Sequence, residues 1–126
     1  MSVKISVSIG ELIDKITILK IKQKKISDAT KLVHVNHELS ELSSTLESLN
    51  LSGIEDHLNE LEVINLELWN IEDDIRDKER SKEFDQDFIA LARAVYVTND
   101  KRFEAKARAN SKYGADIQEV KSYQDY

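Results

Sequence analysis

The residues best suited to binding or catalysis lie in a short acidic run beside the one tryptophan of the chain. Trp69 is followed by Glu72 and Asp73, and Arg76 comes one helical turn after Glu72. Because Mg²⁺ prefers carboxylate oxygens, Glu72 and Asp73 are candidates for binding a magnesium ion or another cation. The same spacing also predicts an ion pair between Glu72 and Arg76 on an exposed helix face, which is the more common arrangement.

A cation also interrupts the most apolar segment in the last third of the chain. Arg93 lies within residues 88–96, which are otherwise apolar and end at Tyr96. A charged side chain is rarely buried without a partner. If this segment packs in the interior, we therefore expect Glu72 or Asp73 to pair with Arg93.

Further polar residues follow this segment at helical spacing. Asn99, Arg102, Lys106 and Asn110 are three or four residues apart and so share one helix face. This stripe suits a phosphate or carboxylate ligand, which Arg102 would bind through two parallel hydrogen bonds. The alternative is that its two cations pair with the acidic middle of the chain. We assign no catalytic residue, metal ligand or cofactor, and the candidate ligand-binding residues are Trp69, Glu72, Asp73, Arg76, Arg93, Tyr96, Asn99, Asp100, Arg102 and Lys106.

The sequence contains none of the familiar spacings of catalytic or metal-binding residues. There is no cysteine, which excludes disulfides and thiolate chemistry. His34 and His37 fall outside the leucine positions of the second predicted helix and do not match the spacing of zinc or di-iron helices. We therefore predict that both histidines are exposed, and an enzyme is not the favoured interpretation.

Composition sets the broad class of protein. The 126 residues have the length of one domain, and the net charge of −6 disfavours nucleic-acid binding, which needs a basic surface. The N-terminus has no apolar run of signal-peptide length, and no stretch approaches the roughly 20 apolar residues of a membrane span. We expect one cytoplasmic domain, residues 1–126, that binds neither nucleic acid nor membrane.

The residues that can start or end a helix predict an all-α fold. With no proline and only three glycines, few positions must end a helix. Ser8 and Glu11 form a capping box, Asp28 can cap a second helix, and Ser52 with Glu55 predicts the start of a third. We predict a coiled-coil-like bundle of four to five helices built on long hairpins, with the second and third helices as antiparallel partners. The other predictions are an extended arm over 1–7, a fifth helix or a continuous fourth one at 98–100, a helix end at Gly114, and a turn and tail over 115–126.

The leading functional hypothesis is based on leucines at heptad spacing. From Leu32 to Leu49 the apolar residues alternate at three and four positions, a narrow stripe typical of coiled coils. Charge also alternates in blocks, with +4 over residues 1–25, −12 over 28–87 and +4 over 93–112. Together these features predict a homo-oligomer, with a dimer favoured, or a complex with a protein partner. The favoured function is an oligomeric helical interaction protein, and the alternative is a small-ligand-binding or Mg²⁺-dependent protein or enzyme that uses the Glu/Asp/Arg cluster.

Five segments are distinctive when taken together: Gly10–Leu19, Leu68–Arg76, Phe88–Tyr96, Asn99–Asp100 and Glu119–Tyr123. With them the chain resembles a family of small helical bacterial and phage-borne proteins catalogued as a domain of unknown function. The resemblance extends over nearly the whole chain and is vaguest over residues 30–60. It implies a shared helical fold and no particular activity. In the family's pattern an arginine–alanine pair follows Asn-Asp, whereas Arg102 is followed by Phe103 here.

Overall fold

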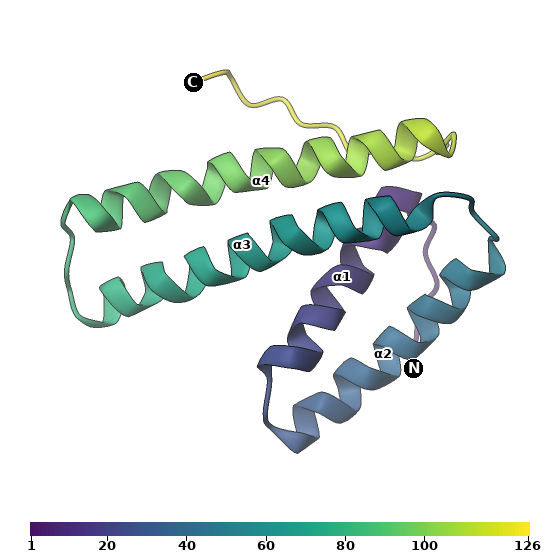
Figure 1. Cartoon of the computed structure of the whole chain (residues 1–126), viewed down its shortest axis with the longest axis horizontal. Coiled ribbons are helices and arrows are strands. Elements are labelled where there is room, and N and C mark those ends of the chain that lie inside the picture. Colours follow the sequence, from purple (N-terminus) through teal and green to yellow (C-terminus); the bar gives the residue numbers. More distant parts are fainter.

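A computed structural model describes all 126 residues and contains four α-helices and no strand (Figure 1). The helices are α1 (Ile9–Lys25), α2 (Ala29–Ser48), α3 (Ile54–Arg80) and α4 (Gln86–Lys112). The predicted all-α class is confirmed. Because α4 is continuous through residues 98–100, the chain has four helices and not five. No helix combines the length and the apolar composition that crossing a lipid bilayer requires.

Side-chain caps begin three of the four helices. At α1 the Ser8 hydroxyl oxygen accepts a hydrogen bond from the backbone N–H three residues later, at 3.1 Å. Asp28 and Asp85 cap α2 and α4 in the same way, each at 2.9 Å. Gly114 follows α4 in the left-handed conformation (φ +63°), as predicted. The serine–glutamate cap predicted for α3 is wrong, because that helix follows Gly53 (φ +77°) and no side chain caps it.

The helices form two antiparallel hairpins that diverge from a shared junction (Figure 1). α1 pairs with α2, α3 pairs with α4, and α1 also packs against both α3 and α4. α2 contacts only α1, so the prediction that α2 and α3 are antiparallel partners is wrong. The reason lies in α1, which carries buried residues around most of its circumference and therefore needs neighbours on several sides.

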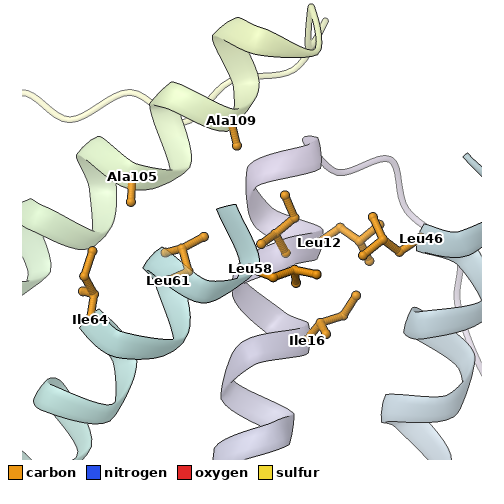
Figure 2. Packing of buried hydrophobic residues seen from close by; sticks show 9 residues of the cluster. Leu12, Ile16, Leu46, Leu58, Leu61, Ile64, Ala105 and Ala109 are labelled. Atoms are coloured by element: carbon orange, nitrogen blue, oxygen red, sulfur yellow. The ribbon is translucent and has the colours of Figure 1, made fainter. Parts of the chain in front are cut away.

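The hydrophobic core lies where α1 meets α3, with α2 on one side and α4 on the other (Figure 2). Ile13 of α1 and Leu61 of α3 are fully buried. α4 contributes Ala105 and Ala109, whose small side chains allow the helices to approach closely. The leucine stripe of α2 packs into the same core through Leu46 and the partly buried leucines before it. This stripe therefore has a partner within the chain, namely α1.

Beyond the junction, α3 and α4 continue as a hairpin of only two helices. We call residues 66–97 the distal hairpin. Asn65 and Thr98 are the buried residues on either side of it, and none of residues 66–97 is itself buried. Its apolar side chains are therefore only half covered.

The two ends of the chain lack regular secondary structure. Residues 1–7 are exposed and precede α1. Residues 115–126 form a tail that runs back beside α4 (Figure 1). Two ion pairs hold the tail to this helix, Glu119 with Lys106 at 2.8 Å and Lys121 with Asp100 at 2.5 Å.

Candidate functional site

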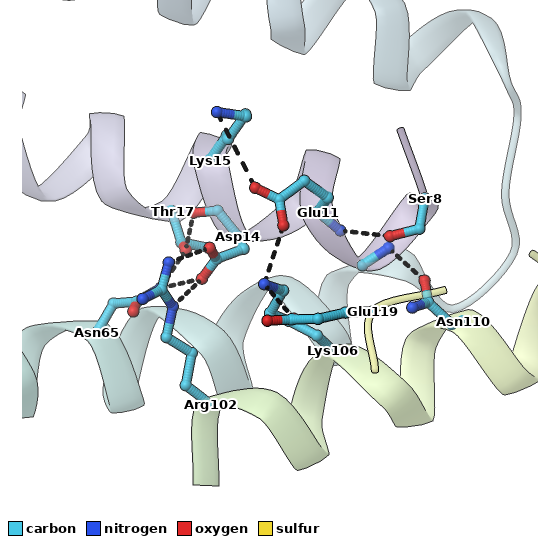
Figure 3. Close-up of polar contacts among 11 residues, drawn as sticks. Ser8, Glu11, Asp14, Lys15, Thr17, Asn65, Arg102, Lys106, Asn110 and Glu119 are labelled. Atoms are coloured by element: carbon cyan, nitrogen blue, oxygen red, sulfur yellow. Dashed lines mark hydrogen bonds and ion pairs between the residues drawn. The ribbon is translucent and has the colours of Figure 1, made fainter. Parts of the chain in front are cut away.

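A cluster of charged and polar side chains lies in the junction of α1, α3 and α4 (Figure 3). At its centre is Asp14, whose side chain is fully buried. Arg102 of α4 donates two hydrogen bonds to this carboxylate, from Nε at 2.9 Å and from Nη2 at 2.5 Å. Asn65 of α3 donates from Nδ2 to Asp14 Oδ1 and to the hydroxyl of Thr17, both at 2.9 Å. Three helices are thus joined by one buried carboxylate.

The sequence brings an acid into this position because of its neighbours in α1. Ile13, Ile16 and Thr17 are buried around Asp14, so the helix cannot turn the carboxylate to solvent without exposing them. A buried carboxylate needs a cation and further donors, since an unpaired buried charge is strongly unfavourable. Arg102 supplies both requirements, because its planar guanidinium matches a carboxylate with two donors.

The surroundings shift the pKa values of Asp14, Arg102 and Lys106 so that each charged form is favoured. Burial raises the pKa of the Asp14 carboxyl, but the hydrogen bonds from Arg102 and Asn65 and the charges of Arg102 and Lys106 outweigh it and hold the pKa below 3.8. The hydrogen bond to Asp14 in turn raises the pKa of Arg102. Burial lowers the pKa of Lys106, but hydrogen bonds to Glu119 and Glu11 raise it above 10.5 overall.

A second part of the cluster lies one turn further along α4. Lys106 pairs with Glu11 of α1 at 2.9 Å and with Glu119 of the tail at 2.8 Å. Asn110 accepts a hydrogen bond from the backbone N–H of Gly10 at 2.7 Å. A Cβ atom at Gly10 would lie only 2.6 Å from the Lys106 carbonyl oxygen, so the two helices can approach this closely only because residue 10 is glycine.

An open pocket of about 350 Å³ adjoins the cluster where α1 and the distal hairpin diverge. Arg102 and Asn65, which both contact Asp14, form part of its lining. The other lining residues are Ile18 and Ile21 of α1 and Leu68, Trp69, Glu72, Asp73 and Arg76 of α3. The pocket therefore combines apolar walls with charged groups from two helices.

Five of the residues predicted from the sequence meet at this pocket. Trp69, Glu72, Asp73 and Arg76 lie along one face of α3, and Arg102 approaches from α4. Glu72 and Arg76 form the predicted ion pair.

The other five candidates lie outside the pocket. Arg93 is exposed and forms no ion pair, so the prediction that Glu72 or Asp73 pairs with it is wrong. The reason is that its neighbours on α4 are themselves only half covered and do not bury it. Tyr96 and Asp100 contact Tyr126 of the tail, and neither Asn99 nor Lys106 lines the pocket.

The predicted polar stripe of α4 faces α1 and not the acidic middle of the chain, so the predicted pairing of its cations with that acidic segment is wrong. Arg102, Lys106 and Asn110 bind Asp14, Glu11 and the backbone of Gly10 in turn. Four residues of the cluster were not predicted as site residues, namely Asp14, Glu11, Thr17 and Asn65, and of these only Glu11 was assigned a role, in the cap of the first helix. One signal was available, because an aspartate inside a helix with apolar residues on nearly every side must be buried and needs a cation.

The pKa of Asp14 predicts how stability depends on pH. Because the folded-state pKa is lowered, the stabilising contribution of this carboxylate is complete above its unfolded pKa of about 3.9 and is lost as the pH falls through the folded value. We expect the difference in free energy of unfolding between the wild type and Asp14→Asn to shrink as the pH is lowered from 5 to below 3.8. Urea unfolding curves at each pH measure this difference. A difference that stays constant or grows in acid would contradict the assignment.

Comparisons with known proteins give one match. The whole chain, residues 1–126, matches the model of a protein family described as a family of unknown function, DUF6165. No curated protein sequence and no solved structure matches the chain.

Proposed function

We propose that this chain, which belongs to the family of unknown function DUF6165, is a helical interaction module that self-associates through its distal hairpin. One observation carries the proposal: residues 66–97 form two long helices in which no side chain is buried. A helix with an apolar stripe must cover it against another element, and two helices alone cover each other only in part. The large apolar residues of the distal hairpin are Leu66, Leu68, Trp69, Ile71, Ile75, Phe84, Phe88, Ile89, Leu91, Val95, Tyr96 and Val97.

The exposed area of the chain supports the same conclusion. A compact monomer of 14.5 kDa is expected to expose about 6,900 Å², whereas this chain exposes 8779 Å². The excess of about 1,900 Å² agrees with an exposed arm over residues 1–7 and with a distal hairpin in which no residue is buried. A standard protein interface buries about 800 Å² of each partner, which this excess can supply.

The proposed occupant is the distal hairpin of a second copy. In the junction α1 provides the third helix that packs against α3 and α4, and towards the turn of the distal hairpin no third helix lies beside them (Figure 1). Two distal hairpins packed together would complete a four-helix bundle, an arrangement that covers apolar faces on all four helices. Residues 66–97 contain nine acidic and five basic side chains, so each hairpin has a net charge of −4. We therefore expect added salt to strengthen the association by screening the repulsion between copies.

Light scattering and sedimentation over micromolar to submillimolar concentrations test the proposal. We expect a dimer for the wild type and a monomer for Ile89→Asp. Ile89 is 45% exposed in the single chain, so an aspartate there is solvated in the monomer. In the dimer the same carboxylate would be buried without a partner, which is unfavourable. The matched control is Val33→Asp on α2, where the replaced residue is 66% exposed and lies outside the distal hairpin. A wild type that is monomeric throughout, or two variants that dissociate equally, would refute the proposal.

A further inference from the structure

We propose that the pocket between α1, α3 and α4 binds a small, planar, uncharged ligand through an amide edge, meaning a carbonyl oxygen beside an N–H. This inference goes beyond self-association, since it concerns a small molecule and not a second copy of the chain. The pocket shares its α3 wall, residues 68–76, with the distal hairpin, so the test below is also made with a variant that does not self-associate. The inference depends on hydrogen-bonding groups of the pocket that the protein leaves unused, on its apolar walls and on its balance of charge.

Two lining residues of the pocket, Arg102 and Asn65, offer one donor group and one acceptor that the protein leaves unused. Arg102 has five N–H donors and uses Nε and one N–H of Nη2 on Asp14, so the Nη1 group forms no hydrogen bond within the protein. Asn65 uses both hydrogens of Nδ2 on Asp14 and Thr17, which fixes the orientation of its amide. Its Oδ1 accepts no hydrogen bond, and it is not sealed from solvent, because the one fully buried side-chain atom without a partner is Nδ1 of His57.

This pair of groups matches a ligand that carries an acceptor and a donor side by side. The carbonyl oxygen of an amide would accept from Nη1 of Arg102, and its N–H would donate to Oδ1 of Asn65. A carboxylate could use only the first of these groups, because it would place a second acceptor against the Asn65 oxygen. Leaving a polar group of a binding site unpaired disfavours the wrong ligand strongly.

The walls of the pocket suit a flat ring. Trp69 and Leu68 line the α3 side, and Ile18 and Ile21 line the α1 side. Aromatic rings stack or pack edge-to-face on tryptophan, and aliphatic side chains cover the opposite face of such a ring. The volume of about 350 Å³ lies at the lower end of the range for small-molecule sites.

The charges around the pocket favour a neutral ligand over an ion. Arg102 is neutralised by Asp14, and Glu72 by Arg76. Asp73 at the pocket has no ion-pair partner and would repel an anion, whereas an ammonium group has no acceptor atom for the Nη1 group of Arg102. An uncharged amide avoids both penalties.

Three probes of equal size separate these possibilities: benzamide, benzoate and benzylammonium. Trp69 is the only tryptophan of the chain and lines this pocket, so its fluorescence reports on binding there. We expect benzamide to change this fluorescence saturably, with a dissociation constant at least about tenfold lower than that of either ion, which corresponds to about 1.4 kcal/mol. Tighter binding of benzoate or benzylammonium, equal binding of all three, or no response to any of them would overturn the proposal.

Two further comparisons link the binding to this pocket. Ile18→Phe fills the pocket from the α1 wall at a half-buried position, and we expect it to abolish benzamide binding. Val33→Phe adds the same ring to an exposed site on α2 and should leave binding unchanged. Retained binding in Ile18→Phe would contradict the proposal, and titrating Ile89→Asp as well separates this result from any failure of self-association.

Discussion

Replacing Arg102 with alanine is expected to lower the free energy of unfolding by about 3–5 kcal/mol, because it leaves a fully buried carboxylate without its counter-ion. Small domains are stable by only about 5–15 kcal/mol in total, so a large part of the stability would be lost. The replacement removes both hydrogen bonds that join α4 to Asp14. Urea unfolding at neutral pH, followed by circular dichroism, measures the change.

Arg108→Ala is the matched control for this variant. Arg108 also lies on α4 and pairs with Glu60 of α3, but its side chain is 53% exposed. Exposed ion pairs contribute at most about 1 kcal/mol, so we expect a small effect. In Arg102→Ala, burial would be the main remaining influence on Asp14 and would raise its pKa, so this variant should regain stability as the pH falls, whereas the wild type loses it. Equal losses in the two variants would show that Asp14 is not held by Arg102.

Leu61→Ala is expected to destabilise the chain by about 2–5 kcal/mol, since it opens a cavity at a fully buried position in the centre of the core. Leu61 belongs to a core cluster to which all four helices contribute, and little around it can move to fill the space. The comparison is Leu66→Ala on the same helix, where the replaced leucine is 39% exposed and the expected loss is below about 1 kcal/mol. Unfolding curves for both variants are measured at one low protein concentration, so that self-association does not contribute to the free energy of unfolding. Similar losses would contradict the described core.

Local features of the fold were predictable from the sequence, because each depends on residues close together in the chain. Ser8 and Asp28 begin helices as their capping patterns predict, and Gly114 ends α4. The arrangement of the helices was not predictable in the same way. The leucine stripe of α2 indicates that something covers it, but the pattern is the same whether the cover is α1 or a second chain.

The candidate site shows the same limit in its polar residues. Glu72 and Arg76 are one turn apart, so their ion pair follows from helical spacing alone. The polar stripe containing Arg102 and Lys106 was also correct as a helix face. Its partners were not predicted, because Asp14 is 88 residues from Arg102 and periodicity does not report such distances along the chain.

The long separation between these partners has a consequence for biosynthesis. A chain emerges from the ribosome N-terminus first, so Asp14 is available 88 residues before Arg102, and Gly10 is available 100 residues before Asn110. Until α4 emerges, a nascent α1–α2 hairpin lacks the cation that makes burial of Asp14 favourable. Contacts between residues so distant in sequence also form slowly. We therefore expect the junction to close only after α4, residues 86–112, has emerged.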